Sequence, residues 1–219
     1  MSNQRPGGAG PVAGLLAVVL ITGCGLVLYE RAVDQERPSP AATGPGQTDP
    51  NELGAAKAGL LPAQDLEGRI APAASGSRTL PDSGTGLGPL TVEQVVRAGP
   101  VPEGDVPRAV TGLQTLGLLD GFGRAVDADR YTLTVVVFRF STPDGAASLV
   151  ELATDDTAVS SASGVPGAIV LPQEPGSTDI GGLFSYGNYA YELTLSGAVD
   201  RTDVDLALRR QYDHVLRTG

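Results

Sequence analysis

The stretch Tyr131–Phe140 reads YTLTVVVFRF and carries the strongest β-strand signal of the chain. It is rich in β-branched and aromatic residues, which pack well on a pleated sheet. Alternation along the strand directs its apolar residues to both faces, with Leu133, Val135 and Val137 on one and Val136, Phe138 and Phe140 on the other. A sheet covered by one helical layer needs only one apolar face. The second face is therefore either covered by helices from residues 91–117 or forms a groove around Phe138 and Phe140 for a lipid or a partner protein.

Further strands and helices are predicted on both sides of this strand. After it, Thr142 is a good N-cap, Pro143 suits the first helical position and Asp144 complements the positive helix end. The other predicted elements are helices at 91–97 and 107–117, strands at 121–127 and 168–171, a hairpin of strands 180–186 and 189–196, and a closing helix at 202–216.

This order of elements predicts one α+β domain over residues 90–219, with a mostly antiparallel sheet and helices packed on it. Residues 121–153 and 180–216 each combine a predicted hairpin with a helix. The two segments are thus candidates for duplicated ββα units.

The predicted hairpin contains four aromatic residues around a short turn, namely Phe184, Tyr186, Tyr189 and Tyr191. If Gly187 and Asn188 form a two-residue loop with positive φ at both positions, all four rings lie on one side of the sheet. Such rings could bind a sugar or an extended peptide. The core interpretation is favoured, because Leu193 and Leu195 continue the same face.

An apolar run occupies the start of the chain, over residues 1–29. Pro11–Tyr29 holds 19 positions without a charge, and a helix of this length reaches roughly 28 Å, close to the thickness of a hydrocarbon core. In one interpretation it is a signal peptide ending in the lipobox-like Ile21-Thr22-Gly23-Cys24, with lipid on Cys24. In the other it is an uncleaved transmembrane helix, because Leu26–Tyr29 remain apolar. Both interpretations predict a protein at the cell membrane with its bulk on the extracytoplasmic face.

Residues 30–89 are rich in Pro and Gly and show no lasting apolar period. Such a segment buries too little apolar surface to offset the entropy of ordering it. It is predicted to be a flexible tether between the anchor and a domain that begins at Leu90.

The combination of a lipobox-like Cys24, a Pro/Gly-rich tether and a small α+β domain resembles actinobacterial envelope lipoproteins and membrane-anchored proteins. The preference for Arg fits that resemblance, since Lys57 is the single lysine among 15 basic residues. The resemblance implies an envelope location and an accessory role, and it brings no catalytic residues with it.

Charge and composition exclude several kinds of chemistry. The net charge of −10 repels phosphates, so nucleic acid is not an expected partner. With one Cys and one His, the chain cannot build a zinc cluster or a disulfide framework. His214 falls on the closing helix among charged neighbours and is expected at the surface. We therefore expect no catalytic residues, no metal and no cofactor.

The favoured function is a non-enzymatic, envelope-anchored binding or accessory module, whose partner is an envelope protein or a small apolar ligand. The alternative is a sensory or structural ectodomain that partners another membrane protein. A binding module predicts a pocket lined by residues from 131–140 or 184–195, whereas an ectodomain of the second kind predicts a flat apolar patch.

Overall fold

The computed structural model describes residues 65–82, 86–97, 101–155, 159–171, 173 and 177–218. The predicted anchor with Cys24 and the first part of the predicted tether lie outside these residues. Within the described ranges, every helix is too short or too polar to span a bilayer.

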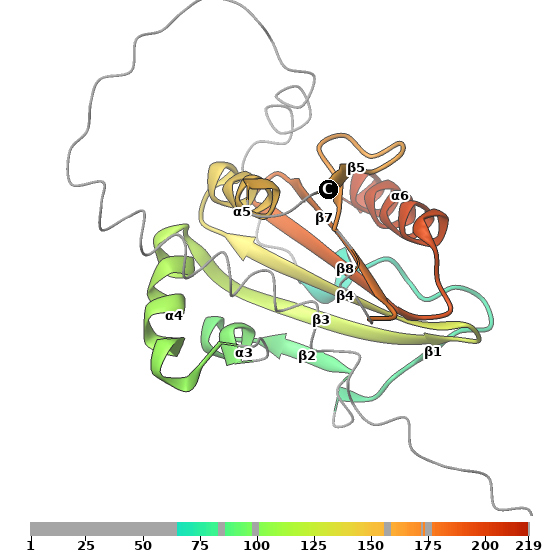
Figure 1. Cartoon of the computed structure of the whole chain (residues 1–219), viewed down its shortest axis with the longest axis horizontal. Helices are drawn as coiled ribbons and strands as arrows, with labels where there is room; N and C mark the ends of the chain where they lie inside the picture. The colour runs from blue at the N-terminus through green and yellow to red at the C-terminus, as the bar shows by residue number, and fades with distance from the viewer. Residues whose placement is uncertain are drawn as a thin grey trace, which may run out of the picture.

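An eight-stranded sheet forms the centre of the domain (Figure 1). Every strand pairing is antiparallel, and the order is β1-β3-β4-β8-β7-β6-β5, with β2 also paired to β3. The strands are β1 (Arg78–Thr79), β2 (Leu87–Leu90), β3 (Leu118–Ala128), β4 (Tyr131–Phe140), β5 (Ser160–Ser161), β6 (Ile169–Val170), β7 (Asp179–Tyr186) and β8 (Tyr189–Gly197). The predicted α+β class and antiparallel sheet are confirmed.

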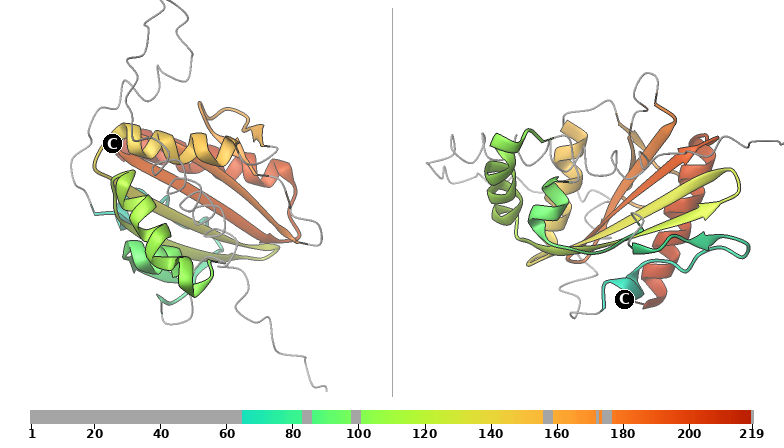
Figure 2. Two further views of the ribbon diagram at one scale, coloured as in Figure 1. Left: turned by 60° about the vertical axis from the view of Figure 1, so that its left-hand side comes forward. Right: turned by 90° about the horizontal axis from the view of Figure 1, so that it is seen from below.

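Helices cover both faces of this sheet (Figure 2). They are α3 (Val92–Arg97), α4 (Val106–Thr115), α5 (Pro143–Asp155) and α6 (Arg201–Thr218), with short 3-10 turns η1 (Glu67–Arg69) and η3 (Glu103–Asp105). Apolar residues of α3, α4 and α5 pack on one face, and those of α6 pack on the other together with Ile70, which follows η1. Each long hairpin is followed by its own helix, as the sequence predicts, but α5 and α6 lie on opposite faces.

The central strand β4 is apolar on both faces because it has a helical layer on each side. Val135 and Val137 belong to the core beneath α6. Val136, Phe138 and Phe140 belong to the core built with α3, α4 and α5. Phe138 and Phe140 are fully buried, so the predicted open groove around them is wrong, and the interpretation in which helices cover this face is confirmed.

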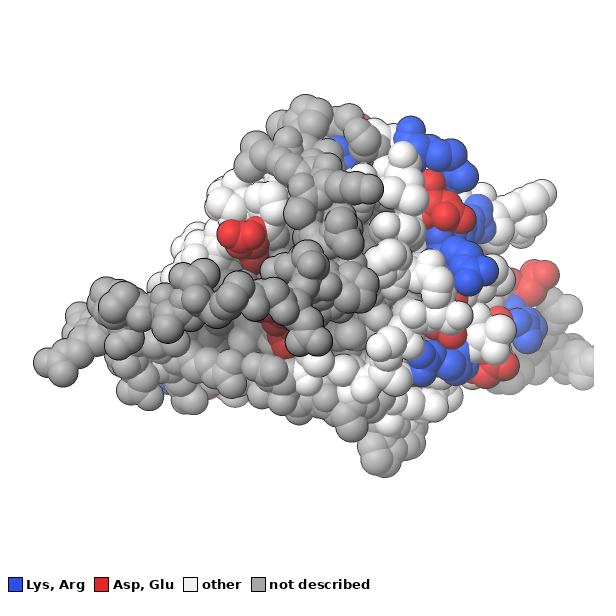
Figure 3. Space-filling model, turned by 90° about the horizontal axis from the view of Figure 1, so that it is seen from above, with Lys and Arg blue, Asp and Glu red and all other residues white. Residues whose placement is uncertain are grey.

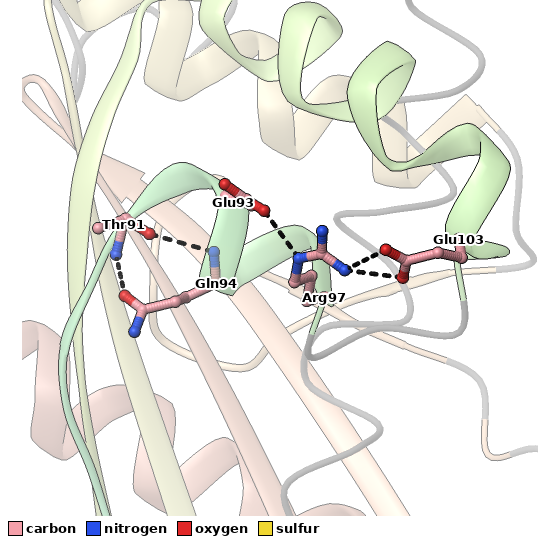
Figure 4. Close-up of polar contacts among 5 residues, drawn as sticks. All are labelled: Thr91, Glu93, Gln94, Arg97 and Glu103. Carbon is pink, nitrogen blue, oxygen red and sulfur yellow. Dashed lines mark hydrogen bonds and ion pairs between the residues drawn. The ribbon is translucent and has the colours of Figure 1, made fainter.

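A capping box defines the start of α3 (Figure 4). The backbone N–H of Gln94 donates to Thr91 Oγ1 at 3.2 Å, and the backbone N–H of Thr91 donates to Gln94 Oε1 at 2.8 Å. This reciprocal pair satisfies two of the donors that a helix start leaves without a partner. Arg97 then bonds Glu93 on its own helix and Glu103 in η3, which ties α3 to the segment that leads into α4.

The long hairpin turns at Gly187 and Asn188, as predicted, but with a different turn geometry. Gly187 has a φ of 57°, whereas Asn188 is not among the described residues with positive φ. The expectation of positive φ at both positions is therefore wrong. One positive φ at the first central residue is what glycine supplies in a type II′ loop. Asn188 instead extends the pairing of β8 with β4, since its carbonyl accepts a hydrogen bond from the Phe140 N–H at 2.8 Å.

The folded domain also includes residues that the sequence assigned to the tether. β1 and β2 pair with β3 along its outer edge, and Ile70 is 3% exposed in the core under α6. Residues 65–82 and 86–89 therefore belong to the domain, and the predicted boundary at Leu90 is wrong.

Hydrogen bonds from α6 hold the first part of this segment. Arg210 donates to the carbonyl of Pro72 at 2.6 Å, and His214 Nε2 lies 2.9 Å from the carbonyl of Gly68. An ion pair of 2.9 Å between Glu67 and Arg124 joins the segment to β3. These partners come from residues more than fifty positions away, which a local apolar period cannot reveal.

Candidate functional site

The aromatic residues singled out in the hairpin lie in the core. Phe184 and Tyr191 stack with ring centroids 4.8 Å apart, and Tyr212 of α6 meets Phe184 edge-on at 5.8 Å. Phe184, Tyr189 and Tyr191 are fully buried, and Tyr186 is partly buried against the same cluster. The alternative of an exposed aromatic platform is therefore wrong, because α6 covers these rings, and the favoured core interpretation is confirmed.

A buried arginine accompanies these rings. Arg69 is 0% exposed, and its guanidinium lies 4.0 Å from the centroid of the Tyr189 ring, a geometry typical of a cation–π contact. Burial raises the pKa of Tyr191 to about 12, although the nearby Arg69 acts in the opposite direction. Tyr191 thus stays neutral at physiological pH, as a core residue should.

The other face of the same strands carries a row of polar side chains, which we call the Glu192 row. It consists of Thr132 and Thr134 of β4, Glu192, Thr194 and Ser196 of β8, and Asp179 of β7. Register places these residues side by side, with Thr134 opposite Thr194, Thr132 opposite Ser196, and Asp179 beside Ser196. The row continues the face that carries Val136 and Phe138, so one face changes from apolar to polar along the strands.

Glu192 stands at the inner end of this row. It is 2% exposed, and neither of its carboxylate oxygens has a hydrogen-bond partner. Its cross-strand neighbours are Val136 and Leu183, which offer no polar group. Burial raises the pKa of Glu192 well above its ordinary value of 4.5. A carboxyl group buried without a partner is costly, and its presence calls for a function or a ligand.

A second polar atom without a partner lies further along the row. The Oγ of Ser196 is buried and has no hydrogen-bond partner. Glu192, Thr134 and Thr194 are buried, whereas Ser196 and Thr132 are partly exposed. The row therefore runs inward from the surface to the Glu192 carboxyl. Ser196 is four residue steps from Glu192 along β8, a length of about 13 Å.

Leucine side chains border the row on both sides. A Cβ added to Gly123 of β3 would come within 2.5 Å of Leu87 Cδ1, and one added to Gly181 of β7 would come within 2.9 Å of Leu171 Cδ1. Leu87 therefore lies over β3, and Leu171 lies over β7. A polar floor between apolar borders is the lining typical of small-molecule sites, in which a few polar groups fix the orientation of the ligand.

The sequence analysis did not identify this row, although its residues follow a regular alternation along the strand. Along β8, Ala190, Glu192, Thr194 and Ser196 alternate with the aromatic and leucine residues of the core. This alternation is typical of a strand with one face in water, and it therefore predicts that Glu192, Thr194 and Ser196 face the solvent. The signal that could have found the row is Val136 and Phe138 in the neighbouring strand, which show that this face is buried.

Charged side chains gather elsewhere. Figure 3 shows acidic and basic residues mixed along one side of the molecule. Helix α6 is itself rich in charged residues, namely Arg201, Asp203, Asp205, Arg209, Arg210, Asp213 and Arg217. In the part of the chain that the structure describes, no three His, Cys, Asp or Glu side chains gather in a way that could hold a metal ion. His214 is partly buried, and its Nε2 contacts the Gly68 carbonyl rather than a carboxylate.

Comparison with solved structures found a likeness to the extracellular domain of PknH from Mycobacterium tuberculosis. The TM-score is 0.38 and the sequence identity is 15%, over 47% of this chain and 66% of that one. This chain thus spans just under two thirds of the length of that domain. No family model and no curated protein matches the chain.

Proposed function

We propose that this protein is a non-enzymatic, envelope-anchored module outside the cytoplasm that binds a small molecule on the Glu192 row. The observation that carries the proposal is the Glu192 carboxyl, which is buried and has no hydrogen-bond partner. A fold tolerates such a group where a ligand supplies the missing bonds.

The row also fits a ligand site better than a catalytic one. Its hydroxyl and carboxyl groups can accept and donate hydrogen bonds, but within the described residues no histidine, cysteine or lysine lies on it to act as a nucleophile or to relay a proton. Binding without chemistry is the activity that this set of side chains supports.

The alternative of an ectodomain that partners a membrane protein through a flat apolar patch receives less support. Among the described residues, the exposed large apolar side chains are Leu119 of β3 and Leu206 and Leu216 of α6. Single exposed leucines are common on soluble domains and do not by themselves mark an interface. The envelope location itself is supported by the sequence of residues 11–29 and by Cys24.

Affinity selection with mass spectrometry tests the proposed site. A library of small cationic, neutral and anionic compounds is incubated with the wild-type protein and with two variants. Ser196→Leu fills the partly exposed end of the row, and Ser161→Leu places the same side chain on the exposed strand β5. We expect a compound that the wild type and Ser161→Leu retain and that Ser196→Leu loses. Retention by all three proteins, or by none, would reject the row as a ligand site.

A further inference from the structure

We infer that the ligand of the Glu192 row carries a cationic nitrogen, an ammonium or guanidinium group, on an apolar stem. This inference rests on the proposed binding function and adds the chemical class of the ligand. It is drawn from the charges around the row, from its length and from its two borders.

The ionisable side chains of the row are acidic. Glu192 lies at the inner end and Asp179, which is 8% exposed, lies beside Ser196 at the outer end. Asp127 of β3 pairs with Thr132 across the strands and forms an exposed ion pair of 3.7 Å with Arg78. The six residues of the row include two carboxylates and no Lys or Arg. An anionic ligand head would therefore meet repulsion, whereas a cationic one would meet attraction.

The Glu192 carboxyl favours a cation over a neutral donor. Burial raises the pKa of Glu192 in the free protein, whereas a cationic head beside the carboxyl lowers it and favours the ionised form. The hydrogen bond between these opposite charges is stronger than the bond between a neutral carboxyl and a hydroxyl. A bound cation also compensates for the unfavourable burial of the carboxylate, which a hydroxyl group cannot do. The Thr194 hydroxyl lies two residues along the same face and is placed to accept a further N–H.

The two leucines that border the row indicate the chemistry of the ligand beyond its charged head. Leu87 and Leu171 flank the row over β3 and β7, and the distance from Ser196 to Glu192 is about 13 Å along the strand. A ligand that lies along the row between Ser196 and Glu192 is therefore flanked by both leucines. An extended apolar stem bearing a single cationic head suits that path. The net charge of −10 also attracts cations to the molecule from a distance.

Three probes with the same stem test this inference, namely n-octylammonium, n-octanol and n-octanoate, each used below its micellar concentration. Binding is measured by calorimetry and by changes in amide NMR signals on β4 and β8. We expect n-octylammonium to bind the wild type at least about tenfold more tightly than n-octanol, and n-octanoate not to bind. In Glu192→Gln the preference for the cation should disappear.

Glu151→Gln is the matched control, because it removes the same charge from an exposed position on α5. It should retain the preference, which separates recognition at the row from general attraction to an acidic protein. If n-octanol bound as tightly as n-octylammonium with the signals on β4 and β8, the cationic class would be wrong while the binding function would stand. If n-octylammonium did not bind, or bound Glu192→Gln equally well, the inference would be overturned. The proposed function would fall only if the compound library also gave no ligand that depends on Ser196.

Discussion

The side chain of Gln211 in α6 bonds the main chain on both sides of Ile70. Its Nε2 donates to the carbonyl of Arg69 at 2.7 Å, and its Oε1 accepts from the N–H of Ala71 at 2.9 Å. Gln211 is 1% exposed, so one buried carboxamide satisfies a donor and an acceptor of a segment about 140 residues away. This bidentate contact holds Arg69 and Ile70 in the core beneath α6.

Replacing Gln211 by Ala should therefore destabilise the domain. The change leaves a buried backbone donor and acceptor without partners, and each such loss costs about 1–3 kcal/mol. Chemical denaturation measures the effect. Gln114→Ala, at an exposed position of α4, makes the same change without a buried contact and should alter stability by less than about 0.5 kcal/mol. Equal effects of the two substitutions would contradict the role assigned to Gln211.

Removal of residues 65–89 should destabilise the domain strongly. A chain that starts at Leu90 lacks β1, most of β2, Arg69 and Ile70, and exposes the outer edge of β3. We expect it to unfold at a much lower denaturant concentration than a chain that starts at residue 60. Removal of residues 38–59, which the sequence assigns to a tether, should leave the midpoint unchanged. A chain starting at Leu90 with the full midpoint would show that the N-terminal strands contribute nothing.

The ring and the hydroxyl of Tyr191 should have separable effects. Tyr191→Ala removes a fully buried ring that stacks on Phe184 and should cost about 3–5 kcal/mol. Tyr191→Phe keeps the ring and removes only the buried hydroxyl beside Arg69, so it should cost less than about 1.5 kcal/mol. Both values follow from denaturation curves. A large loss in Tyr191→Phe would mean that the hydroxyl makes an essential bond.

Glu192 should make stability depend on pH. Its pKa in the folded protein lies well above the ordinary value of 4.5, because burial disfavours the charged form. Between these two pKa values the folded state binds the proton more tightly than the unfolded state, so the free energy of unfolding falls as the pH rises above 4.5. Glu192→Gln cannot ionise and lacks this decline.

The difference between Glu192→Gln and the wild type should therefore grow from pH 5 to pH 8, where the variant should be more stable by at least about 1 kcal/mol. All other ionisable groups are shared, so their contributions cancel in the difference. Parallel curves for the two proteins across this range would show that the carboxyl is solvated or paired in solution.

Cys24 should carry lipid. It is the single cysteine of the chain and follows Ile21-Thr22-Gly23 at the end of an apolar run. Intact-mass measurement of protein extracted from membranes should give a chain that begins at Cys24 with the added mass of acyl groups, and Cys24→Ser should lose that mass. An unmodified chain beginning at Met1 would leave the transmembrane helix as the remaining interpretation.

Local patterns in the sequence determined the main elements of this protein. A run of β-branched and aromatic residues identified β4, and the hairpin pattern around Gly187 and Asn188 identified β7 and β8. Capping residues identified the start of α5. These signals depend on residues a few positions apart. The two apolar faces of β4 indicated that the second face is either covered by helices or open as a groove, and the structure has the helices. The aromatic residues of the hairpin were assigned to the core for the same reason, through the continuation of their face into Leu193 and Leu195.

Contacts between residues far apart in the sequence determine the N-terminal boundary of the domain and the burial of Glu192. Residues 65–89 carry no apolar period, so the sequence predicts a tether. In the structure, residues 65–82 and 86–89 are instead held by Gln211, Arg210 and His214 and by the edge of β3. Glu192 alternates with core residues like any solvent-facing side chain, and only the packing on that face buries it. A local pattern reports which side of a strand a residue occupies. Whether that side meets water, a helix or a ligand depends on the tertiary structure, and so the candidate site was visible only there.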